Sequence, residues 1–146
     1  MLDATGLTTE TKKWNNSFED KVEGTIILIS LANYDHEDFK YELLRVNSFE
    51  KNTHSSTVII FFTNKDIFEK KIKSLPINKF FPSFDGNGSD YDESTNFIQN
   101  YVKNLFSIDC QPYFHYLNLF DVNNIRHVMN AVKDIGYRCT CMITIF

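Results

Sequence analysis

The sequence is poor in cysteine and in basic charge, and each shortage excludes a class of protein. Three cysteines occur among its 146 residues, at Cys110, Cys139 and Cys141. An odd number of cysteines, with no histidine or second cysteine pair at zinc spacing, argues against a secreted disulfide framework and a structural zinc site. We therefore interpret all three as reduced structural thiols. The formal net charge of −4 argues against nucleic acid as the main partner, because phosphate binding needs a basic surface.

The sequence also lacks a hydrophobic run long enough to span a membrane. The longest apolar run, residues 25–32, is far shorter than the roughly 20 residues that a spanning helix needs. The chain opens Met-Leu-Asp, which is neither a signal peptide nor an N-myristoylation start. We therefore expect no membrane anchor in this chain and a cytoplasmic location. The length predicts a single domain with one core.

Short apolar runs alternate with amphipathic segments along the chain, which is typical of a parallel α/β sheet flanked by helices. Strands are predicted near residues 25–31, 57–62 and 113–119. The first two are continuous apolar runs, as expected for strands that are buried on both faces. Helices are predicted over residues 12–20, 38–50, 93–106 and 123–136. The predicted fold class is therefore α/β with a three-stranded parallel sheet.

The opening residues resemble switch II of heterotrimeric G-protein α subunits (Gα), which reads DVGGQRSERKKWIHCFEDV in one-letter code. The chain keeps its Asp3 and Gly6, the Lys-Lys-Trp at 12–14 and the Phe-Glu-Asp at 18–20. Leu7 stands where the family carries the glutamine that positions the attacking water. Further matches follow in the family's order: Ser-Leu-Ala-Asn-Tyr-Asp at 30–35, Phe-Glu-Lys-Lys-Ile at 68–72, Phe-Pro-Ser-Phe at 81–84, Phe-Ile-Gln at 97–99 and Asn-Ile-Arg at 124–126. Several short matches in the right order are far more specific than any one of them.

The resemblance implies a partial Ras-like (P-loop GTPase) domain. Residues 1–146 correspond to its C-terminal half, from switch II to the C-terminal helix. On this reading the phosphate-binding loop, switch I and the helical domain are absent, and so is the first strand of the family's sheet. We therefore expect the strand at 25–31 to have an open edge, which is an association hazard.

The resemblance also implies a site for GTP or GDP with Mg²⁺. Asp3 would reach Mg²⁺ through water, and the Gly6 N–H would meet the γ-phosphate, although both residues also fit a simple turn after a strand.

The guanine base would be read by the segment Thr63, Asn64, Lys65, Asp66 and by the backbone N–H of Leu119. Thr63 and Asn64 replace the family's asparagine and lysine, and bulky Phe120 would crowd a slot that takes a small residue. A one-residue shift that reads Asn-Lys-Asp at 64–66 as the motif remains open. Both base contacts are altered, so guanine selectivity is expected to be lost.

The family's activity is guanine-nucleotide binding and GTP hydrolysis in signalling from G-protein-coupled receptors. No G-x-x-x-x-G-K-[ST] phosphate loop occurs in the sequence, so we assign no catalytic residue and predict that hydrolysis is lost. The partners implied are Gβγ, through the segment 12–18, and a receptor, through the C-terminal helix and the apolar tail 142–146. Such partners would bring the chain to the inner face of the plasma membrane. The alternatives are a nucleotide-free binding module and a non-functional gene fragment.

Overall fold

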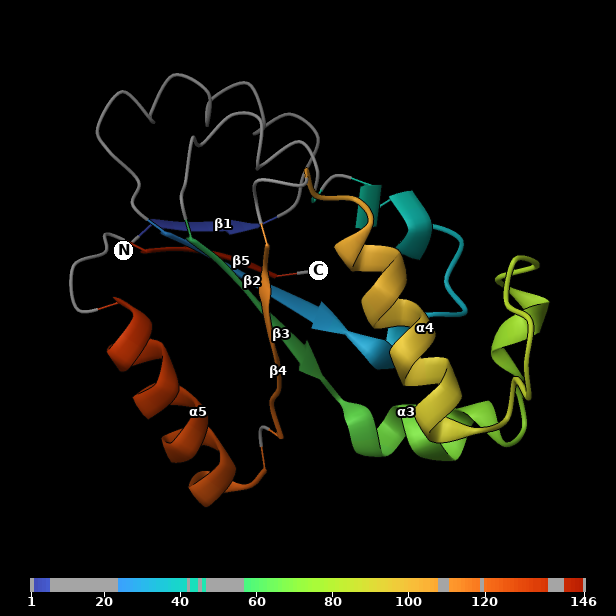
Figure 1. Ribbon diagram of the computed structural model, residues 1–146. Coiled ribbons are helices and arrows are strands. Elements are labelled where there is room, and N and C mark those ends of the chain that lie inside the picture. The colour runs from blue at the N-terminus through green and yellow to red at the C-terminus, as the bar shows by residue number, and fades with distance from the viewer. Residues whose placement is uncertain are drawn as a thin grey trace.

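The residues that the structure describes form a sheet of five parallel strands in the order β1-β5-β2-β3-β4 (Figure 1). The computed structural model describes residues 2–5, 24–41, 43, 44, 46, 57–107, 111–118, 120–136 and 141–145. The strands are β1 (Leu2–Thr5), β2 (Gly24–Ser30), β3 (Thr57–Thr63), β4 (Tyr113–Tyr116) and β5 (Cys141–Ile145).

The three strands predicted from the sequence are adjacent and parallel, as β2, β3 and β4. In β2 and β3 the register runs from Gly24 opposite Thr57 to Ser30 opposite Thr63. In β3 and β4 it ends with Phe62 opposite Tyr116. The predicted α/β fold class is confirmed, and β1 and β5 add two further parallel strands to the sheet.

The expectation of an open edge on β2 is wrong. The C-terminal segment, interpreted from the sequence as an apolar tail, is β5 and pairs along β2 from Gly24–Cys141 to Leu28–Ile145. Its residues Cys-Met-Ile-Thr-Ile are rich in β-branched side chains, which favour strands. This pairing satisfies backbone groups on the edge of β2 that were expected to lack a partner.

Side chains of β2 and β3 alternate between two cores, as the period of two in a strand requires. One face of the sheet contributes Ile27, Ile29, Val58, Ile60 and Phe62 to the larger cluster. The opposite face contributes Ile26, Ile59 and Phe61 to the smaller one. Both faces are apolar, which explains why the two strands are continuous hydrophobic runs in the sequence.

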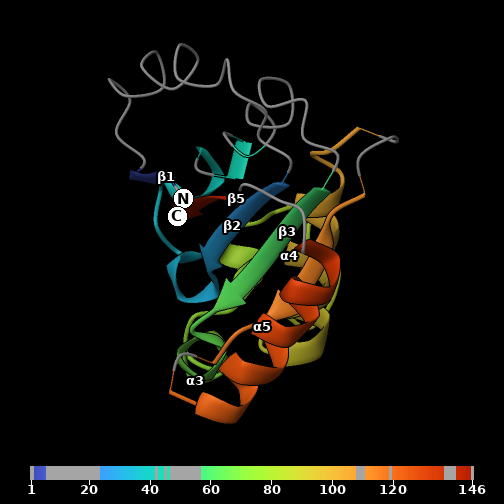
Figure 2. The same ribbon diagram turned by 90° about the vertical axis from the view of Figure 1, so that its left-hand side faces the viewer.

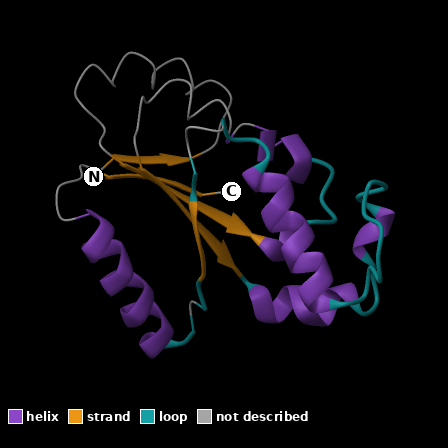
Figure 3. Ribbon diagram, in the orientation of Figure 1, coloured by secondary structure: helices purple, strands orange, loops and turns teal. Residues whose placement is uncertain are grey.

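Helices cover both faces of the sheet (Figures 2 and 3). They are α3 (Lys65–Ile72), α4 (Tyr91–Lys103) and α5 (Val122–Gly136), with short 3-10 turns η1 (Leu31–Asn33) and η2 (Ile77–Lys79). Residues 39–41, 43, 44 and 46 are also helical, within the predicted helix at 38–50. Within the described ranges, no helix has both the length and the apolar character needed to cross a membrane.

The helix boundaries follow from capping side chains. Predicted to begin at residue 93, α4 begins two residues earlier, because the carboxylate of Asp90 accepts a hydrogen bond from the N–H of Glu93 at 2.9 Å. At the start of α5, the carboxylate of Asp121 accepts from the N–H groups of Asn123 and Asn124 at 3.0 and 3.1 Å. The predicted helix at 12–20 lies outside the described residues.

Two layers therefore enclose the sheet. On one face Val128 and Ile125 of α5 pack on Ile26, Ile59 and Phe61. On the other face α3 and α4 bury Phe68, Ile72, Ile98 and Val102 in the larger cluster. Figure 2 shows α5 in front of β2 and β3, with α4 behind them. The loops that follow β2, β3 and β4 leave the sheet at a common edge, because the strands are parallel.

Candidate functional site

The candidate site lies at the carboxyl ends of β2, β3 and β4, where the predicted base-recognition segments follow their strands. The segment 63–66 spans the end of β3 and the start of α3. Residues 117–121 connect β4 to α5. A hydrogen bond from the N–H of Leu117 to the carbonyl of Phe62, 2.8 Å long, holds the two loops side by side. The structure therefore places the segment 63–66 and the described residues after β4, Leu117 and Asn118, at one edge of the sheet.

Thr63 and Asn64 direct their side chains into the protein's own framework. Thr63 is buried, and its hydroxyl donates to the carbonyl of Ile29 at 3.5 Å. Asn64 has φ 56° and ψ 35°, a left-handed conformation that asparagine tolerates better than most residues. Its side-chain N–H donates to the hydroxyl of Ser30 at 3.0 Å. Both side chains thus tie the end of β3 to the end of β2.

Lys65 and Asp66 form the first turn of α3, and both are half-buried. Phe68 anchors this turn, because its N–H donates to the carbonyl of Asn64 at 3.0 Å and its ring is fully buried. Within the described part of the chain, the carboxylate of Asp66 has no hydrogen-bond or ion-pair partner. Of the four residues in the segment, Asp66 is the one with a carboxylate, which can accept hydrogen bonds from a ligand.

The loop between β4 and α5 is held by its own asparagines. The N–H of Asn118 donates to the side-chain oxygen of Asn124 at 2.8 Å, and the side-chain oxygen of Asn118 accepts from the N–H of Phe120 at 3.1 Å. Leu119, whose N–H was predicted to contact the base, lies outside the described residues. Phe120 is 84% exposed. Its ring therefore faces solvent, and the crowding of the base slot by this side chain stays a prediction.

Asp3 lies in a different part of the sheet from the base-recognition segment. Its backbone is in β1, opposite Ile143 of β5. In the sheet order, β5 and β2 separate β1 from β3, and three strand spacings amount to about 14 Å. Gly6 and Leu7 lie outside the described residues. Across the described ranges, no three histidine, cysteine or acidic side chains come together as a metal-binding group.

A polar network that the sequence motifs did not predict joins the end of β2 to α3. The ammonium of Lys71 donates to the carboxylate of Asp35 and, at 2.9 Å, to the carbonyl of Ala32. Tyr34 is fully buried, and its hydroxyl donates to the carbonyl of Leu75. Burial, followed by the charge of Asp35, raises the pKa of Tyr34 to about 12. The network fixes η1 against α3 and so positions the start of the candidate base loop.

Two members of this network, Tyr34 and Asp35, carried a signal in the sequence, because they belong to the Ser-Leu-Ala-Asn-Tyr-Asp match at 30–35. Outside the network, Asp121 followed by Asn124 has the spacing of a capping residue and the first turn of a helix. The partner of Asp35, Lys71, is 36 residues away, and no periodic pattern connects residues at such a separation.

His115 lies opposite Phe61 in the register of β3 and β4, on the face of the sheet that α5 covers. It is half-buried on β4, with its ring centroid 5.9 Å from that of Phe61. Burial, followed by the charge of His127, lowers the pKa of His115.

We expect His115 to make the folded state less stable as the pH falls below about 6.5, the ordinary histidine pKa. Because the folded pKa is lowered, the unfolded chain binds more protons in this range. The stabilising contribution is therefore complete above the unfolded pKa and is lost as the pH falls through the folded one. Urea unfolding at several pH values from 5 to 7.5 measures the slope. His115→Phe should flatten it, whereas His36→Asn, at a histidine whose side chain is 66% exposed, should not. Equal slopes for wild type and His115→Phe would contradict the expectation.

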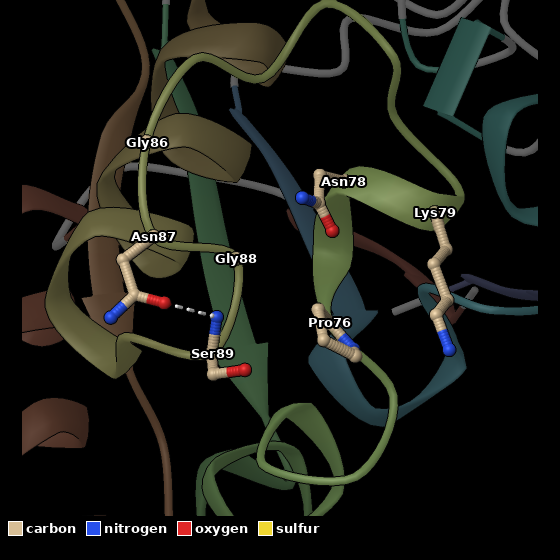
Figure 4. A pocket seen from close by; sticks show the side chains of 7 residues that line it. All are labelled: Pro76, Asn78, Lys79, Gly86, Asn87, Gly88 and Ser89. Carbon is tan, nitrogen blue, oxygen red and sulfur yellow. Dashed lines mark hydrogen bonds between the residues drawn. The ribbon is translucent and has the colours of Figure 1, made fainter.

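An open hollow of about 540 Å³ lies elsewhere, in the connection between α3 and α4 (Figure 4). It is lined by Pro76, Asn78, Lys79, Gly86, Asn87, Gly88 and Ser89. The side-chain oxygen of Asn87 accepts from the N–H of Ser89 at 3.2 Å, and the carbonyl of Gly88 accepts from Ile77 at 2.9 Å. Residues 85–90, which supply part of this lining, read Asp-Gly-Asn-Gly-Ser-Asp, a polar and glycine-rich composition that is typical of a surface loop. None of the predicted site residues lines the hollow.

Comparison with known proteins identifies the family. The model of the G-protein alpha subunit family matches residues 1–136. The chain belongs to the Gα family. Its parallel sheet and flanking helices are those of a partial Ras-like α/β GTPase domain.

Curated relatives share about a third of the aligned residues. The chain is 36% identical to the guanine nucleotide-binding protein alpha-2 subunit of Dictyostelium discoideum, covering 92% of this chain and 40% of that protein. It is 34% identical to the alpha-4 subunit of Caenorhabditis briggsae, covering 94% and 42%. It is 31% identical to a guanine nucleotide-binding protein alpha subunit of Candida albicans, covering 92% and 34%. The chain thus spans about two fifths of the length of the first two relatives.

Proposed function

We propose that this Gα chain acts in heterotrimeric G-protein signalling as a binding module that does not turn over GTP. Membership of the family supports the signalling role. The observation that carries the non-catalytic part is the internal use of Thr63 and Asn64 at the base-recognition loop. Residues 1–146 would then serve as the C-terminal half of a Ras-like domain, and partner contacts would be their function.

The hydrogen bonds at this loop support the proposed weakening of base recognition. The hydroxyl of Thr63 and the amide of Asn64 are both directed to β2, towards Ile29 and Ser30. A ligand that needed these side chains would have to break contacts that hold two strand ends together. Breaking such a contact costs roughly 1 kcal/mol for a neutral hydrogen bond. The framework thus competes with the base for the same groups.

The partners that we propose are Gβγ and a G-protein-coupled receptor. The candidate contact with Gβγ, residues 12–18, lies outside the described residues. For the receptor, α5 offers an exposed surface that includes Val122, Arg126 and Met129. Contact with such partners would place the chain at the inner face of the plasma membrane.

A second candidate function is nucleotide binding without hydrolysis. Asp66 favours it, because its carboxylate, which has no partner among the described residues, lies in the first turn of α3 at the sheet edge. A carboxylate there could accept the two N–H donors of a guanine edge. Asp3 would be the residue to meet Mg²⁺. This function gives GDP or GTP as the cofactor, and it remains compatible with a signalling role.

Titration with fluorescent GTP and GDP separates the two functions. For the purified 146-residue chain we expect no saturable, Mg²⁺-dependent binding at micromolar protein concentration, because Thr63 and Asn64 are engaged internally and no phosphate loop is encoded in this sequence. Immobilised Gβγ should retain the same preparation, and Trp14→Ala, at the proposed contact segment, should weaken retention. Ile67→Ala is a matched control, since Ile67 is 45% exposed and lies outside that segment.

Three outcomes would change the assignment. Saturable nucleotide binding that Asp66→Ala abolishes would establish the second function. Binding that survives Asp66→Ala would contradict the role of that residue. A chain that binds neither nucleotide, Gβγ nor receptor would support the gene-fragment alternative.

A further inference from the structure

The first and last strands along the chain, β1 and β5, are neighbours in the sheet, and β1 depends on β5 for its place there more than β5 depends on β1. In the sheet order, β1 lies at one edge and its neighbour is β5. All four residues of β1 pair with β5, from Leu2–Met142 to Thr5–Ile145. On its other side β5 pairs with β2, from Gly24–Cys141 to Leu28–Ile145. The strand nearest the C-terminus thus lies between β2 and the strand nearest the N-terminus (Figure 1).

The order of the strands allows β1 and β5 to separate from the rest of the sheet. β2 also pairs with β3 along its whole length, from Gly24–Thr57 to Ser30–Thr63. Loss of β5 would leave that pairing intact. It would, however, remove the neighbour through which β1 joins the sheet.

We propose that β5 is a latch: β1 stays in the sheet only while β5 does, so that every opening of β5 also releases β1. Opening exposes backbone N–H and C=O groups on the edge of β2 at Gly24–Leu28. A buried sheet can release a terminal unit at a lower free energy than global unfolding, because local units open independently of the most stable core. The latch therefore joins the two ends of the chain.

The latch constrains recognition of the C-terminus. A partner that took residues 141–145 as an extended peptide would have to replace their hydrogen bonds to β1 and β2, as in β-strand addition. The same event would take β1, including Asp3, out of the sheet. Binding at the C-terminal strand and retention of β1 are then mutually exclusive. This coupling requires neither nucleotide nor any of the partners named above.

Amide hydrogen exchange on the intact chain, in low concentrations of urea, tests the latch without nucleotide or partner. Residues 2–5 should open with a free energy no higher than that of residues 141–145, and both should open more readily than residues 58–62 of β3, because local units open below the free energy of global unfolding. A higher opening free energy at residues 2–5 than at residues 141–145, or no protection at residues 2–5, would overturn the proposal.

Two substitutions at one position give a second test. Thr144→Pro removes a backbone donor from the interior of β5, which a central strand does not tolerate. Thr144→Val keeps the donor and a β-branched side chain, and is the matched control. We expect Thr144→Pro to raise exchange at residues 2–5 at least tenfold and to leave β3 and β4 within twofold of wild type. Thr144→Val should change none of these by more than twofold. Retained protection of β1 in Thr144→Pro would overturn the latch, and so would equal loss of protection in β1 and β3.

Discussion

The purified 146-residue chain should release no phosphate from GTP above the buffer blank, and Leu7→Gln should not restore turnover. In P-loop GTPases, catalysis depends on the phosphate loop with its lysine, an arginine that stabilises the transition state and a glutamine that orients water. The sequence contains no match to G-x-x-x-x-G-K-[ST], and Leu7 stands at the glutamine position. The arginine alone typically contributes on the order of a thousandfold or more. Restoring one component leaves the others absent from this chain.

Single-turnover and steady-state phosphate release, each measured with a preparation of Asp66→Ala in parallel, check this expectation. Asp66 is the base-loop carboxylate without a partner in the described ranges, so any hydrolysis at the candidate site should depend on it. Hydrolysis that persists unchanged in Asp66→Ala indicates a contaminating GTPase. Hydrolysis by the wild-type chain that Asp66→Ala abolishes would refute the non-catalytic assignment.

Local patterns in the sequence were sufficient for the strands β2, β3 and β4 and for α5. The runs at 25–31 and 57–62 form β2 and β3, because each buries alternate side chains on both faces. The helix predicted at 123–136 begins one residue earlier, at Val122. In each case the determining interactions lie within a few residues along the chain. Periodicity reports such interactions directly.

Long-range pairing is what the sequence did not reveal. Residues 141–145 form a five-residue apolar run, which fits a strand, a tail or the end of a helix equally well. Their assignment as β5 depends on β2, more than a hundred residues earlier, and on β1. The family's strand order does not indicate that residues 141–145 can pair with β2, which is why an open edge is wrongly expected from the sequence.

The sequence was sufficient to predict that the segment 63–66 follows a strand, but it did not predict the hydrogen bonds of that segment. Residues 63–66 do lie at the carboxyl end of β3, beside the loop after β4. The hydrogen bond from Asn64 to Ser30 and the solvent exposure of Phe120 depend on backbone geometry. A left-handed conformation at Asn64 turns its side chain towards β2, and no letter pattern at 63–66 specifies that conformation.

The largest effect on stability is expected from Phe62→Ala. Phe62 is fully buried near the carboxyl end of β3, stacked on Phe114 with ring centroids 5.7 Å apart and tilted against Tyr116 at 5.5 Å. Truncation of a buried phenylalanine costs about 3–5 kcal/mol, since transfer energy is lost and a cavity remains. Phe120→Ala, at a ring that is 84% exposed, should change the free energy of unfolding by less than about 0.5 kcal/mol.

Urea unfolding followed by circular dichroism measures both changes at one pH and temperature. A loss of about 3–5 kcal/mol is a large part of the roughly 5–15 kcal/mol that stabilises a typical domain, so Phe62→Ala could fail to fold at all. Ile60→Val, at a fully buried position of the same strand, then gives a graded test, with an expected cost of about 0.5–1.5 kcal/mol. Equal costs for Phe62→Ala and Phe120→Ala would mean that β3 is not the centre of the core. The same result would also contradict the proposed loss of base recognition, because that loss depends on a rigid β3 before the loop at 63–66.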